Sequence, residues 1–348
     1  MFKVVSNLIE LRGSMIKKIL KKIMLSIGVI LSIVVIICLC IIINGTCLKS
    51  YKNDKDLSNW MSNINDEVLV NEVVIPGSHD AGTYKMNWLG ETQQFDIDKQ
   101  LEMGVRYFDI RVNKIDDGDY VIFHSIINGV EFLPILNSFK EFIINNPSET
   151  LLLDFQHFSG NSQDDVYNFI TEYLFDNGLL VVNDTQLTDL QFINQLKMKD
   201  ARGKAIIFWG DRSYDSTNYL FTRNNDSCSY NDMCLNSYYD SDYHSKDYNF
   251  LIENGYPIYF ENIVNKITNE GKGIFVLQAQ LTDSKLIFGP YSKEKTNSKK
   301  ISNYIKSFKD KEELKYLNVI MRDFYDVNKS IEIINLNYYK NNCSNLFN

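Results

Sequence analysis

The residues Ile75-Pro76-Gly77-Ser78-His79-Asp80-Ala81-Gly82-Thr83 join the end of a short apolar run to a histidine and an aspartate. Further along the chain, a second apolar run contains Asp109-Ile110-Arg111, and a third run ends in His124. Two imidazoles can move protons, carboxylates can orient them, and a guanidinium group can hold anionic oxygens. The three segments therefore predict acid–base chemistry on a phosphoryl group.

Charge is distributed unevenly along the 348 residues, whose formal net charge is -8. Residues 1–22 contain a cluster of Lys and Arg against Glu10 alone, about +5 by formal count. The chain after the uncharged segment that follows them therefore carries roughly -13. A domain this acidic has no broad electrostatic attraction to nucleic acid, which excludes nucleic acid as a partner.

The segment Ile23–Ile43 contains no charged residue and is long enough to span a bilayer as a helix. Because its basic flank is N-terminal, the positive-inside rule places residues 1–22 in the cytoplasm and the remainder outside. The alternative is a cleaved signal peptide and a secreted protein, but such a peptide has a shorter apolar core and a better cleavage site. We expect a single-pass anchor at 23–43, a polar stalk at 44–56 and one catalytic domain at 57–348.

The chain has 6 cysteines, and Cys47, Cys228, Cys234 and Cys343 would face the oxidising exterior, where disulfides can form. Cys228 and Cys234 are near enough in sequence to close a small loop, and the sequence leaves this pairing open. No spacing of His and Cys resembles a zinc site.

After residue 57, short apolar runs alternate with segments of helical periodicity, of which Phe132–Ile144 is the clearest. The predicted strands are Glu72–Ile75, Val105–Val112, Tyr120–His124, Thr150–Phe155, Ala205–Trp209, Pro257–Phe260, Gly273–Gln278 and Asn318–Met321. Continuous apolar strands are typical of parallel sheets covered on both faces. The alternation predicts an α/β fold, a TIM-type (β/α)8 barrel, with a doubly wound open sheet as the alternative.

A barrel would gather the polar residues that stand at the C-terminal ends of its strands at one mouth. The residues in such positions are His79, Asp80, Asp109, Arg111, His124 and Asp323. Asp109 is either catalytic itself or the ion-pair partner of Arg106 or Arg111. Residues 210–256 do not fit the alternation, and we expect them to form a long excursion near the mouth.

These segments resemble, in this order, the X domain of phosphatidylinositol-specific phospholipases C. The matching segments are Ile75–Thr83, Gly104–Val112 and Phe123–Ser125, followed by Glu149–His157, Arg202–Phe208 and Asn318–Phe324, which match the branch containing only an X domain. The resemblance covers roughly Leu57 to Leu336. It implies a distorted β/α barrel that cleaves the phosphodiester between inositol and diacylglycerol.

The resemblance also implies a role for each matched residue. His79 resembles the general base of the family and His124 the general acid. Asp323 matches the carboxylate that orients the base, and Asp80 matches the one coupled to the acid. Arg111 matches the guanidinium that contacts the phosphate in metal-independent bacterial members, whereas calcium-dependent relatives carry an acidic ligand there. The resemblance therefore implies no catalytic metal and no cofactor.

The positions that hold the inositol ring depart from the family pattern. Bacterial members use an Arg after one strand, and an Asp and a Tyr after a later one. This chain has Trp209 and Asp211 at the first place, and Gln278 and Gln280 at the second. These four residues are the candidates for contact with the head group, whose identity stays open.

The expected activity is that of a phosphatidylinositol diacylglycerol-lyase, which produces diacylglycerol and inositol 1,2-cyclic phosphate from a membrane phospholipid by acid–base catalysis. A metal-dependent glycerophosphodiester or sphingomyelinase-D-like phosphodiesterase on the same barrel is one alternative, and Arg111 counts against it. The other alternative is a non-catalytic surface barrel that binds inositides or glycans, which the altered head-group positions leave open.

Overall fold

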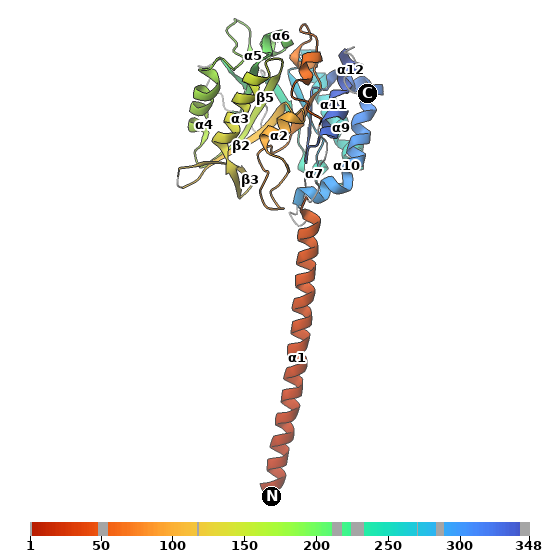
Figure 1. Cartoon of the computed structure of the whole chain (residues 1–348). Helices are drawn as coiled ribbons and strands as arrows, with labels where there is room; N and C mark the ends of the chain where they lie inside the picture. Colours follow the sequence, from red (N-terminus) through yellow and green to blue (C-terminus); the bar gives the residue numbers. More distant parts are fainter. Residues whose placement is uncertain are drawn as a thin grey trace.

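The protein consists of a long N-terminal helix and a barrel (Figure 1). The computed structural model describes residues 2–47, 55–116, 118–210, 218–223, 233–269, 271–282 and 289–341. Helix α1 (Phe2–Gly45) contains a segment, Arg12–Gly45, that is long and apolar enough to cross a membrane, and none of its most apolar window is buried against the barrel.

The barrel strands run parallel in the order β7-β6-β5-β2-β1-β10-β9-β8. Their bounds are β1 (Ile75–Ser78), β2 (Tyr107–Lys114), β5 (Thr150–Ser159), β6 (Lys204–Trp209), β7 (Leu220–Thr222), β8 (Leu235–Ser237), β9 (Ile274–Gln278) and β10 (Val319–Arg322). A parallel bridge between Arg223 and Leu235 joins the two end strands, so that the sheet is nearly closed. The prediction of a TIM-type barrel after an N-terminal helix is confirmed.

Helices cover the barrel and join its strands. They are α2 (Ile97–Glu102), α3 (Phe132–Asn145), α4 (Gln163–Ile170), α5 (Asp189–Ile193), α6 (Met198–Ala201), α7 (Ser241–His244), α8 (Tyr248–Phe250), α9 (Tyr256–Asn269), α10 (Gly289–Ser307), α11 (Val327–Ile334) and α12 (Leu336–Asn341). On α3 the predicted apolar face is buried, with Phe132, Leu136 and Phe139 packed in the core between barrel and helices.

Strand β1 requires a glycine where it packs inside the barrel. A Cβ atom at Gly77 would lie 2.6 Å from Val319 Cγ1 and 2.9 Å from Tyr107 Cδ1, which is closer than such atoms can approach. The small residue lets β1 lie between β10 and β2, with which it pairs. The backbone of β1 is thereby fixed directly before His79.

One predicted barrel strand belongs to a hairpin instead. Strand β3 (Tyr120–His124) pairs antiparallel with β2 and with β4 (Ile127–Glu131), and lies off the path of the barrel. His124 therefore reaches the mouth at the tip of this hairpin and not at the end of a barrel strand.

Two other predictions about the strands are wrong. Pro257–Phe260 lies in α9, where Tyr256, Tyr259, Phe260 and Ile263 are buried at helical spacing. The segment 210–256 is not only an excursion, because β7 and β8 come from it.

The disulfide that the sequence leaves open between Cys228 and Cys234 is not tested, because Cys228 lies outside the described residues.

A buried ion pair lies at the end of the barrel where the strands begin, opposite the mouth. It connects the segment around Leu57 to the start of β5. Arg106 Nη2 lies 2.8 Å from Glu149 Oε2, and both side chains are inaccessible to solvent. The guanidinium also donates to the carbonyl oxygens of Leu57 and Ser58. Arg106 therefore has Glu149 as its ion-pair partner and does not pair with Asp109.

Candidate active site

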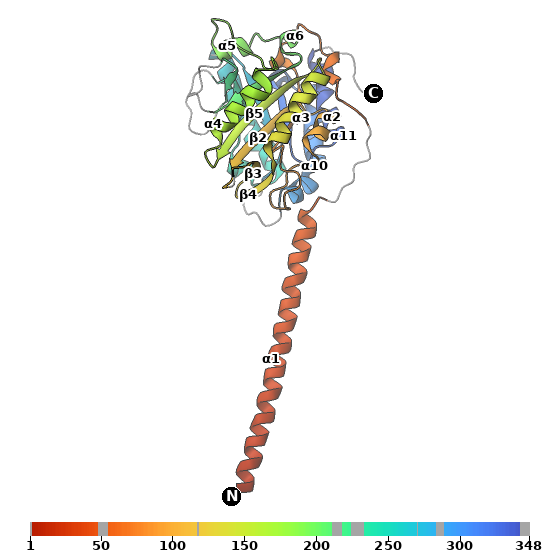
Figure 2. The same ribbon diagram turned by 60° about the vertical axis from the view of Figure 1, so that its left-hand side comes forward.

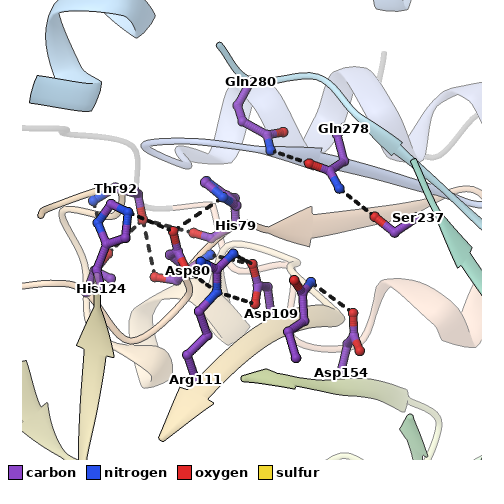
Figure 3. Close-up of polar contacts among 12 residues, drawn as sticks. His79, Asp80, Thr92, Asp109, Arg111, His124, Asp154, Ser237, Gln278 and Gln280 are labelled. Atoms are coloured by element: carbon purple, nitrogen blue, oxygen red, sulfur yellow. Dashed lines mark hydrogen bonds and ion pairs between the residues drawn. The ribbon is translucent and has the colours of Figure 1, made fainter. Parts of the chain in front are cut away.

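A cavity of about 330 Å³ opens at the C-terminal ends of the barrel strands. It is lined by His79, Asp80, Arg111, His124, Gln156, His157, Arg223, Ser237, Tyr239, Gln278 and Thr282. The histidine, aspartate and arginine residues that stand far apart in the sequence thus meet at one place, as the barrel topology predicts. Figure 3 shows the polar contacts of His79, Asp80, Arg111 and His124 with one another and with neighbouring residues.

His79 follows β1 and is held on both its side chain and its backbone. Its Nδ1 lies 2.7 Å from Asp323 Oδ1, directly after β10, which pairs with β1. The carbonyl oxygen of His79 accepts hydrogen bonds from Thr92 Oγ1 at 3.0 Å and Gln93 Nε2 at 2.9 Å. The Asp323 carboxylate selects the tautomer with the proton on Nδ1, so Nε2 of the neutral ring is free to accept a proton.

Asp80 lies between the two imidazoles. Its Oδ2 is 3.3 Å from His79 Nε2 and 3.6 Å from His124 Nε2. The residue has a φ of 45°, in the left-handed region that is costly for a residue with a side chain. Its backbone N–H donates to Asp109 Oδ2, which helps to hold this conformation. The Nε2 atoms of both imidazoles therefore lie close to the same carboxylate oxygen of Asp80, on one side of the cavity.

His124 is oriented by a loop and not by a carboxylate alone. Its Nδ1 lies 2.9 Å from the carbonyl oxygen of Gly90, which can only accept, so Nδ1 carries a proton. The Nε2 atom consequently points toward Asp80 and the cavity (Figure 3). Ser125 follows with a φ of 56°, where the chain turns into β4.

Arg111 pairs with two carboxylates at the floor of the cavity. Its Nε lies 2.6 Å from Asp80 Oδ1, and its Nη2 lies 2.9 Å from Asp109 Oδ2. Asp109 and Arg111 are two positions apart on β2 and so point to the same side. The pairing of β2 with β5 shifts between Ile110 and Arg111, because β5 has one extra residue, Gln156, at this point. Of the two arginines considered as ion-pair partners of Asp109, it is Arg111 that pairs with it.

The charges of the site shift the pKa values of its members. Burial alone would lower the pKa of His79, but the carboxylates of Asp80 and Asp323 outweigh it and raise the pKa to about 9. Burial alone would raise the pKa of Asp80, but Arg111 and the two imidazoles lower it to about 2. The resting site at neutral pH therefore holds an ionised Asp80 beside an imidazolium at His79.

Residues 69–210 match the family described as phosphatidylinositol-specific phospholipase C, X domain. This part of the chain belongs to that X-domain family. Among curated proteins, the 1-phosphatidylinositol phosphodiesterase of Listeria monocytogenes is 27% identical over 168 residues, which is 46% of this chain and 50% of that protein. The enzyme of the same name from Staphylococcus aureus is 32% identical over 106 residues, 28% of this chain and 34% of that protein. The matches thus span half or less of these relatives.

The fold likeness extends beyond the aligned segment. The phosphatidylinositol-specific phospholipase C from Listeria monocytogenes superimposes with a TM-score of 0.58 at 19% identity, over 81% of this chain and 99% of that one. A structure of the S. aureus enzyme gives 0.55 at 20% identity, over 78% and 93%. The C-terminal half of the barrel, which lies beyond the X-domain match, therefore shares the same architecture.

A second polar group, not predicted from the sequence, lies at the same cavity. Arg223, after β7, places its Nε 2.7 Å from Asp154 Oδ1, and Tyr107 donates to Asp154 Oδ2 at 2.6 Å. Gln156 donates to the same oxygen at 2.9 Å. Asp154 is a charged residue within the apolar run of β5, and this is the sequence signal that could have identified it as a site residue. Nothing of the kind marks Arg223, because β7 is not apparent in the sequence.

His157 and His244 differ from the two histidines at the centre. Burial and the charge of Arg111 lower the pKa of His157, which lines the cavity. Burial also lowers the pKa of His244, whose Nδ1 contacts the Asp240 carbonyl oxygen at 2.9 Å. Both rings are therefore neutral at physiological pH, unlike His79.

The four candidates for head-group contact have different places. Gln278 lines the cavity, where it donates to Ser237 Oγ at 2.7 Å and accepts from Gln280 at 2.9 Å. Trp209 is buried, with its ring 4.5 Å from that of Phe158, and the described lining of the cavity does not include it. Asp211 lies outside the described residues.

The X domain also contains a cluster with the geometry of a cation site. One ligand atom each from His79, Asp80 and Asp109 lie within 4.8 Å of one another. Arg111, however, already forms ion pairs with both carboxylates. A divalent ion at this position would have to displace the guanidinium or share the carboxylates with it, at a cost in charge repulsion.

Proposed function

We propose that the protein is a metal-independent phosphatidylinositol-specific phospholipase C. It cleaves phosphatidylinositol into diacylglycerol and inositol 1,2-cyclic phosphate. The observation that carries the proposal is the placement of two imidazole Nε2 atoms within 3.6 Å of one Asp80 oxygen, with Arg111 on the other oxygen of the same carboxylate. The X-domain membership and the names of the bacterial relatives support the choice of substrate.

In the proposed first step, the inositol 2-hydroxyl attacks the adjacent phosphorus. An internal attack profits from alignment, because well-oriented intramolecular reactions reach effective molarities of about 10⁵–10⁸ M. His79 accepts the hydroxyl proton on Nε2, and the Asp323 carboxylate at Nδ1 stabilises the imidazolium that forms. Since Nδ1 and Nε2 lie on opposite sides of the ring, both contacts are possible at once.

His124 then protonates the glycerol oxygen as the bond to phosphorus breaks. The proton on Nδ1 of His124 stays hydrogen-bonded to the Gly90 carbonyl oxygen. The proton that is transferred therefore comes from Nε2 of the imidazolium. Each of the two proton transfers contributes about 10²–10⁴ in rate. Arg111 neutralises the charge that gathers on the non-bridging oxygen that faces it, while its Nε and Nη2 stay paired with Asp80 and Asp109.

The membrane anchor belongs to the same proposal. Helix α1 spans the bilayer within Arg12–Gly45, with its basic N-terminal flank in the cytoplasm and the barrel outside. The cluster of Lys and Arg on the N-terminal side of the apolar segment supports this orientation. A lipid substrate and a lipid-embedded helix place enzyme and substrate in the same environment.

Phosphorus NMR of the full-length protein in mixed detergent micelles with phosphatidylinositol tests the activity. We expect a resonance of inositol 1,2-cyclic phosphate to appear at the same rate with and without excess EDTA. Abolition by EDTA and recovery with Ca²⁺ or Mg²⁺ would instead favour a metal-dependent phosphodiesterase that uses the His79, Asp80 and Asp109 cluster. Binding without any phosphorus product would favour the non-catalytic barrel.

The pH dependence of kcat/KM gives an independent prediction about His79. On a nitrophenyl substrate, whose leaving group needs no general acid, kcat/KM depends on the base form of His79 alone. Since the pKa of His79 in the free protein is about 9, kcat/KM for this substrate should rise with pH and level off near 9. Asp323→Asn removes a carboxylate that raises this pKa, and the acid limb should move down by about 1 pH unit.

The matched control is Asp326→Asn. The Asp326 carboxylate accepts from the N–H groups of Asn328 and Lys329 and caps α11, a role that asparagine also fills. This variant should keep the acid limb of the wild type. If Asp323→Asn also keeps it, the titrating group is not His79.

A further inference from the structure

The C-terminal end of α1 lies against the mouth of the barrel. Cys47 Sγ donates to Gln94 Oε1 at 3.2 Å, and α1 also contacts α10. Gln94 belongs to the loop after β1, and α10 follows the segment after β9. Both contacts are therefore on the side where the parallel strands end, which is the side of the cavity.

The loop that Cys47 contacts also holds both central histidines. Gln93, the neighbour of Gln94, donates to the carbonyl oxygen of His79 at 2.9 Å. Gly90, earlier in the same loop, accepts from Nδ1 of His124 at 2.9 Å. The end of the apolar helix and the two imidazoles are thus attached to one short segment of chain.

The two views of the ribbon agree on the direction in which α1 leaves the barrel. It leaves on the side of β3, β4 and α10, whereas α5 and α6 lie at the opposite end (Figures 1 and 2). Helices α5 and α6 precede β6 and so mark the end where the strands begin. The membrane segment projects from the catalytic face.

An exposed isoleucine extends from this same face. Ile126 lies at the turn of the β3–β4 hairpin, two positions after His124, and is 95% exposed. A large aliphatic side chain this exposed gains free energy when it enters an apolar phase. The hairpin that positions His124 therefore presents an apolar tip beside the cavity.

We propose that the cavity faces the membrane in which α1 is embedded, so that the enzyme acts in cis on the lipids of the leaflet from which α1 emerges. The tip of the β3–β4 hairpin contacts that leaflet. This inference rests on the proposed phospholipase activity and on the proposed anchor.

Two vesicle mixtures test the inference with the full-length protein. In the cis mixture, the protein and phosphatidylinositol share phosphatidylcholine vesicles; in the trans mixture, the same total amount of phosphatidylinositol is in separate vesicles. Rates are normalised to the fraction of outward-facing barrel. We expect cis turnover to exceed trans turnover on the order of 10²-fold, because tethering raises the effective substrate concentration.

Mixed detergent micelles provide the reference in which orientation is irrelevant. Turnover in micelles together with equal rates in cis and trans would overturn the inference, as would turnover in micelles without any in the cis vesicles. Absence of turnover even in micelles would refute the proposed phospholipase activity and not the orientation of the mouth.

A pair of isoleucine variants tests the hairpin contact. Ile126→Ser should lower cis turnover in vesicles about ten-fold while leaving turnover of a short-chain, monomeric phosphatidylinositol unchanged. Ile144, at the end of α3 that precedes β5, is 50% exposed on the opposite side of the barrel. Ile144→Ser should leave both rates unchanged. An Ile126→Ser variant that slows neither substrate, or slows both equally, would show that the tip does not contact the membrane.

Discussion

His79→Ala should lower kcat for phosphatidylinositol cleavage about 10³-fold or more. The variant loses the group that accepts the 2-hydroxyl proton and leaves the buried Asp323 carboxylate without its 2.7 Å partner. His124→Ala should cause a similar loss, because the glycerol oxygen would leave as an alkoxide. Steady-state turnover in mixed micelles measures both effects, and circular dichroism establishes that the variants are folded.

A substrate with a nitrophenyl leaving group separates the two roles. A phenolate of low pKa leaves without protonation, so it does not need a general acid. His124→Ala should therefore regain most of its rate on this substrate, whereas His79→Ala should not. If neither variant, or only His79→Ala, is restored, the assignment of base and acid is wrong.

His157→Ala is the matched control for these variants. His157 lines the same cavity, but its lowered pKa keeps the ring neutral, and among the described residues no carboxylate forms an ion pair with it. We expect its loss to change kcat less than ten-fold. A loss as large as that of His79→Ala would mean that the third cavity histidine also takes part in proton transfer.

The clusters that the sequence predicts correctly are those that stand directly after an apolar run. His79, Asp80 and Asp323 follow short strands in which every residue is buried, and the parallel barrel places the ends of all such strands at one mouth. His124 is placed correctly for a different reason. Tyr120–His124 is as apolar as a barrel strand, and only its antiparallel pairing with β2 identifies it as part of a hairpin.

The parts that the sequence does not predict are fixed by tertiary packing. Strand β8 contains Asn236 and Ser237, which are buried yet polar, so no apolar run marks it. Strand β7 is equally short, and Arg223 beside it acquires its place only when Asp154 on β5 pairs with it. The periodicity of apolar residues indicates which face of a helix or strand is buried, but it does not indicate which buried polar side chains pair with each other.

Asp80 and Arg111 illustrate how the strained backbone and the charges depend on each other. The left-handed φ of Asp80 turns its carboxylate toward Arg111 and the two imidazoles. The guanidinium in turn keeps the pKa of Asp80 at about 2, so that the carboxylate stays ionised at any pH at which the histidines work. Removal of the guanidinium would thus affect both the phosphate and the arrangement of the proton-transfer groups.

Arg111→Ala should lower kcat about 10³-fold, and Arg111→Lys about 10²-fold. Both variants lose the fork that pairs with Asp80 and Asp109, but lysine keeps a positive charge near the phosphate. Phosphorothioate analogues of the substrate show whether the contact is direct. The wild type should discriminate strongly between the two diastereomers, because Arg111 lies on one side of the phosphorus, and both variants should lose most of this preference. A variant that becomes slow but keeps the stereochemical preference would show that Arg111 only supports Asp80 and does not touch the phosphate.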